Sequence, residues 1–197
     1  MALPRPALHS PLPVPAWYQR PSPEADTPYL RLSDASAEGK ITIEGAEAAA
    51  VLAEAWGVRG LAVTAGAGVP GGQVYCLRPD LFFVHTEPDA VATTLDTLMA
   101  AVARCGAFVT VTDVTHGRAG IRVQGPGSAE LLARLCGLDF RPTAFPDGTA
   151  RFGSLANTRQ LLIRSDRDGM LTYVVFGPRS LGAYVWETMV AAAAREG

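Results

Sequence analysis

The chain has 197 residues, of which 48% are hydrophobic and 18% are charged, and its formal net charge at pH 7 is −2. This composition suits one large domain or two small lobes with a shared core, and it excludes a disordered chain. Lysine and arginine are scattered without a basic face, so nucleic acid is not an expected partner. We find neither an apolar run of about 18 residues nor the apolar core of a signal peptide, and we therefore expect a cytoplasmic protein without a membrane partner.

The cysteines and histidines do not form a reactive or metal-binding set. Cys76, Cys105 and Cys136 are odd in number, far apart and set among apolar residues, so we expect buried, reduced thiols. The histidines show no ligand spacing and none lies near a cysteine pair, so no metal site is expected. His116, in a turn that ends at Gly117, is at most a contact residue.

Residues 1–28 hold eight of the fifteen prolines, which rules out a helix or a central strand and predicts an extended, proline-rich arm. The arm also carries apolar side chains, including Trp17 and Tyr18. Such residues indicate an arm that packs on its own globule or on a partner subunit, with a plain flexible tail as the alternative.

Two similar successions of elements follow the arm. Each consists of strand, strand, helix, strand, strand and helix, with helices opened by proline or closed by glycine. The glycine-dense stretch 60–72 is interpreted as a surface loop. The expected strands cover residues 29–32, 40–44, 73–77, 81–86, 108–111, 119–124, 149–155, 161–164 and 171–176, and the expected helices cover 46–56 and begin at Pro88, Pro126 and Pro178.

The two successions form an internal repeat. Six residues between Ile41 and Gly57 recur 80 positions later, and the later part of the repeat aligns at an offset of 90, so the second copy has about ten extra residues around 140–148. We predict an α+β fold of two pseudo-repeated lobes, 29–106 and 107–197, each an antiparallel sheet with helices packed on one face. The pattern leaves open whether the two sheets share or exchange their leading strands.

Three strings that resemble functional motifs are better explained by backbone geometry. Residues 66–71 fit G-x-G-x-x-G, but a strand follows instead of a helix, which favours a surface loop over a nucleotide site. Residues 125–128, G-P-G-S, lack a following lysine, and their proline removes a donor, which favours a structural strand-to-helix corner. Asp166 and Asp168 flank an arginine in a hairpin turn. We therefore predict no catalytic, cofactor-binding or metal-binding residue in this chain.

One run of sequence carries a family resemblance. It consists of D-V-T-H-G-R at 113–118, I-R-V-Q-G-P at 121–126, L-L-A-R-L-C-G-L-D at 131–139 and R-P-T-A-F-P-D-G at 141–148. This run resembles the gamma subunit of heterotetrameric sarcosine oxidase, whose fold is related to that of the aminomethyltransferase (T-protein) of glycine cleavage. The resemblance extends over about residues 40–195.

The resemblance implies a non-catalytic subunit of a flavin-dependent complex that oxidatively demethylates sarcosine, or a related secondary or tertiary amine, to glycine. In such a complex the alpha, beta and delta subunits are the partners. Flavin, NAD and tetrahydrofolate are then expected on the partner subunits, with one-carbon transfer to tetrahydrofolate taking place there. Candidate partner contacts are Trp17, Tyr18, His116, Arg141 and Phe145.

Two alternatives are a folate-dependent aminomethyltransferase-like enzyme and a stand-alone ligand-binding module. The aminomethyltransferase relatives imply a carboxylate on a strand after an Asn-x-x-Gly-Gly turn. The stretch compared with it, residues 155–164, has neither the glycine pair nor an acid. Without a carboxylate, nothing there would stabilise a developing iminium charge.

Overall fold

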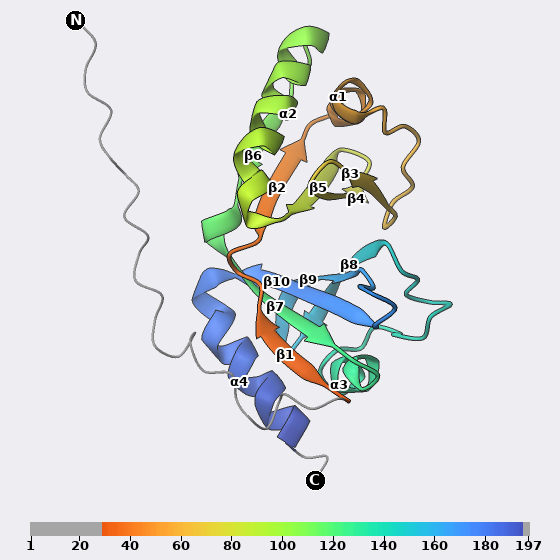
Figure 1. Ribbon diagram of the computed structural model, residues 1–197, viewed down its shortest axis with the longest axis vertical. Helices are drawn as coiled ribbons and strands as arrows, with labels where there is room; N and C mark the ends of the chain where they lie inside the picture. The colour runs from red at the N-terminus through yellow and green to blue at the C-terminus, as the bar shows by residue number, and fades with distance from the viewer. Residues whose placement is uncertain (1–28, 195–197) are drawn as a thin grey trace, which may run out of the picture.

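The computed structural model describes residues 29–194, which form two lobes, each a five-stranded antiparallel sheet with two helices on one face (Figure 1). This confirms the predicted α+β fold of two pseudo-repeated lobes. The elements in chain order are β1 (Arg31–Asp34), β2 (Gly39–Glu44), α1 (Ala48–Trp56), β3 (Gly66–Val69), β4 (Gly72–Arg78), β5 (Leu81–Thr86), η3 (Pro88–Ala90), α2 (Val91–Cys105), β6 (Thr110–Asp113), η4 (Thr115–Gly117), β7 (Arg118–Gln124), α3 (Ser128–Leu135), β8 (Thr149–Leu155), β9 (Thr158–Arg164), β10 (Thr172–Pro178), η5 (Arg179–Leu181) and α4 (Gly182–Ala193).

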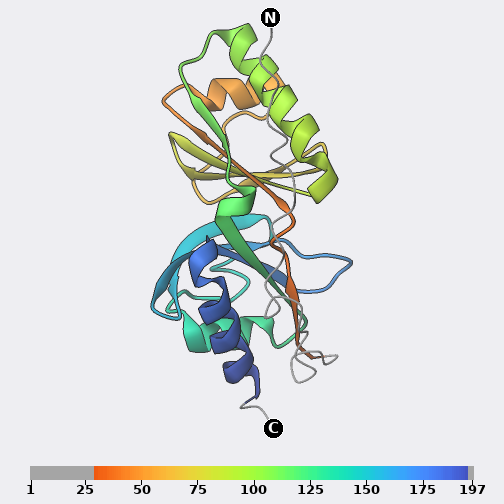
Figure 2. The same ribbon diagram turned by 90° about the vertical axis from the view of Figure 1, so that its left-hand side faces the viewer.

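The lobes stack as four layers, helices–sheet–sheet–helices, along the long axis of the molecule (Figure 2). One apolar cluster lies between the first sheet and α1 and α2, a second between the other sheet and α3 and α4, and a third between the two sheets. The central strands are therefore covered on both faces. This explains why β5 and β10 have continuous apolar runs instead of alternating ones.

The two sheets exchange their leading strands, which answers the question that the sequence left open. The first sheet has the order β3-β4-β5-β2-β6 and the second β1-β7-β10-β9-β8. Thus β1, at the start of the first repeat, pairs with β7 of the second lobe, and β6, at the start of the second repeat, pairs with β2 of the first. Neither sheet is complete without a strand from the other half of the chain.

The strand register corrects the second repeat offset. Ile43 of β2 lies opposite Phe82 of β5, and Val123 of β7 lies opposite Tyr173 of β10. The offset between the repeats is therefore 80 residues from β2 to β7 but 91 residues from β5 to β10. At the predicted offset of 90, Phe82 would match Thr172, and every side chain would change faces. At 91, Phe82 and Tyr173 both face the helices. The extra residues are also not confined to 140–148, because the β8–β9 hairpin is longer than β3–β4.

Two further expectations are wrong. The stretch 60–72 is not wholly a loop, because Gly66–Val69 forms β3 and pairs with β4 in a hairpin that turns at Pro70 and Gly71. Gly71 has a φ of 73°, as the third residue of a Pro-Gly type II turn requires. Among the cysteines, Cys76 and Cys136 are buried as expected, but Cys105 is exposed in the last turn of α2.

We predict that Gly120→Ala destabilises the fold. A Cβ at Gly120, in β7, would lie 2.7 Å from the carbonyl oxygen of Ala35 and 2.8 Å from the ring of Phe176, so the inter-sheet layer would have to shift. Overpacking of this kind costs about 1–3 kcal/mol. Urea unfolding measures the loss of free energy of unfolding. Gly117→Ala is the control, since no atom lies within 4 Å of a Cβ there, and equal stability of both variants would contradict the prediction.

Candidate functional site at the crossover between the two sheets

The two crossover segments, 35–38 and 114–117, carry the chain from one sheet to the other and have matching turns. The carboxylate of Asp34 accepts the backbone N–H of Ser36 at 2.8 Å, and the carboxylate of Asp113 accepts the backbone N–H of Thr115 at 2.8 Å. These Asx-type turns direct each chain out of its strand. The equal geometry at residues 79 positions apart supports the internal repeat at the level of atoms.

Each crossover is also bound to the strand that leaves the other crossover. The hydroxyl of Ser36 accepts the N–H of Gly120 at 2.7 Å, and the hydroxyl of Thr115 accepts the N–H of Lys40 at 3.0 Å. Both hydroxyls are buried, so these bonds satisfy backbone donors that water cannot reach. The repeat therefore brings two copies of one small motif into mutual contact.

Lys40, the single lysine of the chain, breaks this symmetry, because its counterpart is Gly120. Its side chain is fully buried, and its Nζ donates to the carbonyl oxygens of Ser36 at 3.0 Å, Glu38 at 2.6 Å and Thr115 at 3.2 Å. The ammonium also lies 5.4 Å from the centre of the Phe176 ring. All three of its donors are thus used, and the amine ties both crossovers together.

Burial lowers the pKa of Lys40 to about 8. The nearby carboxylates of Glu38, Asp113 and Asp34 oppose this change by favouring the charged amine, and the positive charge of Arg179 adds to it. The amine has no free lone pair while it donates three hydrogen bonds as an ammonium. Its surroundings therefore suit a structural cation and not a nucleophile.

Glu38 links the two sheets through its side chain. One carboxylate oxygen lies 2.5 Å from Nε2 of His85 in β5, and the other is paired with the guanidinium of Arg122 in β7. Burial raises the pKa of Glu38, but the hydrogen bond with His85 and the charges of His85, Arg122 and Arg167 outweigh burial, so the pKa is lowered overall. This carboxylate is engaged on both oxygens and is closed to a ligand.

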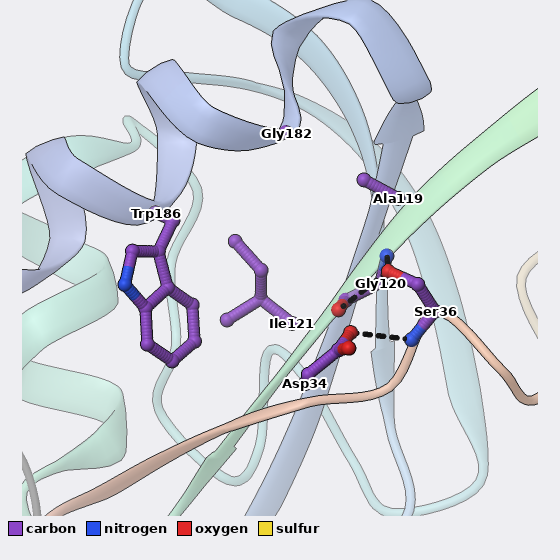
Figure 3. A pocket seen from close by; sticks show the side chains of 7 residues that line it. All are labelled: Asp34, Ser36, Ala119, Gly120, Ile121, Gly182 and Trp186. Atoms are coloured by element: carbon purple, nitrogen blue, oxygen red, sulfur yellow. Dashed lines mark hydrogen bonds between the residues drawn. The ribbon is translucent and has the colours of Figure 1, made fainter. Parts of the chain in front are cut away.

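A hollow beside the crossover is too small for a cofactor. It lies between the start of α4 and strands β1 and β7, and in Figure 3 Ile121 lies between Trp186 and Asp34, whose carboxylate is turned to the backbone nitrogen of Ser36. Its volume is about 20 Å³, which is room for roughly one water molecule. Within residues 29–194, no group of three or more histidine, cysteine, aspartate or glutamate side chains could hold a metal ion.

The structure also shows a glycine-pair turn that the sequence comparison missed. Gly71 and Gly72 lie at the turn that leads into β4, and the next strand residues that are buried are Val74, Tyr75 and Cys76. Strand β4 reads G-Q-V-Y-C-L-R and has no acid, and β9, which begins after the other hairpin turn, has none either. Neither β4 nor β9 therefore carries an acid at the place where the resemblance to the aminomethyltransferase implies one.

Of the predicted contact residues, the structure describes three, and they lie in two separate segments of the chain. Trp17 and Tyr18 lie outside the described residues. His116 is exposed on η4 at the crossover, and Arg141 is exposed in the loop between α3 and β8, paired with a neighbouring aspartate. Phe145 is fully buried, so the expectation of a partner contact there is corrected: its ring packs on Phe140 and Tyr173 in the core of the second lobe.

Phe108 is an exposed aromatic residue that the sequence analysis did not single out. Its side chain is 93% exposed at the approach to β6, and its counterpart before β1 is Tyr29. The Tyr29 ring covers Gly127, where an added Cβ would lie 2.5 Å from a ring carbon. In the first lobe the position of that glycine is taken by Glu47, whose carboxylate accepts the N–H of Phe108 at 2.8 Å. The Phe108 ring therefore has no site on its own lobe.

The chain and its two-lobed fold are similar to known proteins. The model of the GCVT N-terminal domain matches residues 25–197. The chain belongs to this family. Among solved structures, a chain of the heterotetrameric sarcosine oxidase from Corynebacterium sp. U-96, in complex with pyrrole 2-carboxylate, matches with a TM-score of 0.73 and 26% identity over 84% of both chains. None of the curated proteins compared matches the chain.

The GCVT fold is also found in the glycine cleavage system aminomethyltransferase T from Bartonella henselae, with a TM-score of 0.68 and 17% identity. That match covers 87% of this chain but 50% of the aminomethyltransferase, so the chain spans half the length of that enzyme. The predicted resemblance, in fold and in family, is confirmed. No helix between residues 29 and 194 is long and apolar enough to cross a membrane.

We predict that Lys40 makes stability rise with pH in the alkaline range. Between pH 8 and 10.5 the unfolded chain binds the Lys40 proton while the folded chain has released it, so the free energy of unfolding increases with pH. The increase is of the order of 3 kcal/mol over the full range. Urea unfolding of the wild type and of Lys40→Met at several pH values isolates it. Other groups, including Cys76, titrate in both proteins and cancel in the comparison. A difference in free energy of unfolding between the two proteins that stays constant with pH would contradict the prediction.

Proposed function

We propose that this chain is the gamma-type, non-catalytic subunit of a sarcosine-oxidase-like, flavin-dependent complex. Its role is to stabilise the large subunits that hold flavin, NAD and tetrahydrofolate. Those subunits demethylate sarcosine, or a related secondary or tertiary amine, to glycine and pass the one-carbon unit to tetrahydrofolate. The partners are alpha-, beta- and delta-type subunits.

The carrying observation is the match to a chain of a heterotetrameric sarcosine oxidase over 84% of both chains. That chain is matched over 84% of its length, whereas half of the aminomethyltransferase lies outside the match. The chain is thus matched over most of the length of a chain of an assembly, and over half of the length of the aminomethyltransferase. This favours the subunit over the enzyme.

The polar side chains at the crossover support a non-catalytic role. The amine of Lys40 and the carboxylate of Glu38 are both saturated by partners inside the fold. No acid stands on β4 or β9, where a folate-dependent relative is expected to carry one. Exposed apolar groups such as Phe108 are instead what a subunit interface uses as anchors.

We predict that co-expression with the large subunits gives a complex that elutes as one species on gel filtration. The chain made alone should show no oxidase activity and no bound flavin. Separate elution of the co-expressed chains would contradict the subunit role, and tight binding of tetrahydrofolate to the chain alone by calorimetry would favour the enzyme instead.

We further predict that Phe108→Ser weakens this complex at least tenfold while the free energy of unfolding of the isolated chain changes by less than about 0.5 kcal/mol. Phe108 is almost wholly exposed, so loss of its ring removes little contact with the other described residues, 29–194. The dissociation constant is measured by biolayer interferometry. Met170→Ser, at an exposed apolar residue of the second lobe, is the control, and equal dissociation constants for both variants would contradict the prediction.

A further inference from the structure

The first lobe contains an open apolar cavity whose matching place in the second lobe is filled by side chains. The cavity has a volume of about 360 Å³, within the range of about 300–1,000 Å³ that is typical of ligand pockets. It lies between α1, the segment 57–65 and strands β4 and β5. No charged side chain lines it; its walls are Ala49, Leu52, Val58, Gly60, Leu61, Ala62, Val63, Cys76, Pro79 and Phe82.

The internal repeat identifies what stands at the same place in the second lobe. Phe82 corresponds to Tyr173, because both lie opposite equivalent residues of β2 and β7. Cys76, opposite Phe82, corresponds to Arg164, opposite Tyr173. Likewise Leu52 of α1 corresponds to its counterpart 80 residues later in α3, and both are core residues. The walls of the cavity therefore have a defined set of counterparts.

Those counterparts are covered by two phenylalanine rings. Phe140 and Phe145 stack on each other with their centres 5.8 Å apart, and both meet the Tyr173 ring edge-on at 5.6 Å. The carbonyl of Phe145 also accepts a hydrogen bond from Arg164 at 2.9 Å. Both rings come from the loop that joins α3 to β8. The equivalent segment of the first lobe, residues 57–65, has no aromatic residue to offer.

We propose that this cavity receives an aromatic side chain of a partner protein, a proposal that rests on the subunit role given above. The fold already uses phenylalanine rings to close the equivalent site, and an uncharged cavity disfavours a charged occupant. Ala62, Val63 and Pro79 form an exposed apolar rim. Beyond it lies the exposed ion-pair group of Glu44, Arg78 and Asp80. An apolar pocket with a polar surround is the arrangement in which interface anchors are found.

The cavity is tested by filling it from the α1 side. Ala49→Leu places a larger side chain against the cavity, and Ala50→Leu, at an equally exposed position of the same helix that does not line the cavity, is the matched control. The proposal expects the complex of the full chain with the large subunits to dissociate at least tenfold more readily with Ala49→Leu and unchanged with Ala50→Leu. Equal affinity of the two variants would overturn the proposal while leaving the subunit role intact.

Binding to the cavity can also be measured with a small probe in the absence of the large subunits. Fluorobenzene, followed by fluorine NMR with the full chain alone, should bind the wild type and Ala50→Leu but not Ala49→Leu. Absence of binding to the wild type overturns the proposal. Binding that occurs only in a Trp17→Ser, Tyr18→Ser variant also overturns it, because this chain would then fill its own cavity. Failure of the wild type to assemble with the large subunits instead refutes the subunit role, and with it any partner-supplied ring.

Discussion

The exchange of β1 and β6 between the sheets is the constraint on which the rest of the structure depends. Because each sheet takes its edge strand from the other half of the chain, neither half can complete its sheet alone. The chain must therefore cross between the sheets twice, and each crossing contains a buried residue, Ser36 or Thr115, beside backbone groups that need a partner. Ser36 and Thr115 satisfy the N–H groups there, and the buried amine of Lys40 binds three of the carbonyls. The polar chemistry of the interior follows from the topology.

This topology explains why the residues that resemble active-site groups are bonded to partners within the fold. A buried lysine, a histidine and a glutamate close together would elsewhere indicate an acid–base site. Here Glu38 accepts from His85 on one sheet and Arg122 on the other, so its charge is compensated within the fold. An ion pair of this kind adds little net stability compared with apolar packing, but losing one partner would leave a buried charge. The cluster therefore defines how the sheets meet.

The sequence was sufficient for the fold class, because helix periodicity and glycine stops are local signals and the offset of 80 residues can be found by aligning the sequence with itself. It could not give the offset of 91, since matches at 90 arise from composition, in part from its many alanines, whereas the true register depends on which face of β10 meets α4. The Glu38, His85 and Arg122 cluster was also out of reach, because its members are 47 and 84 residues apart. The single lysine beside Ile41 was the one available hint of a polar inter-sheet layer.

At two matching places, the second lobe covers apolar groups that the first lobe leaves open. In the second lobe, the Tyr29 ring covers Gly127, and Phe140 and Phe145 close the space beside Tyr173. At the matching places in the first lobe, the Phe108 ring is uncovered and the cavity beside Phe82 is open. Exposed apolar surface lowers the stability of a free subunit, so a lobe that leaves both places uncovered is suited to a partner that covers them. At these two matching places, the duplication thus gave one lobe that covers its apolar groups and one that leaves them open to contact.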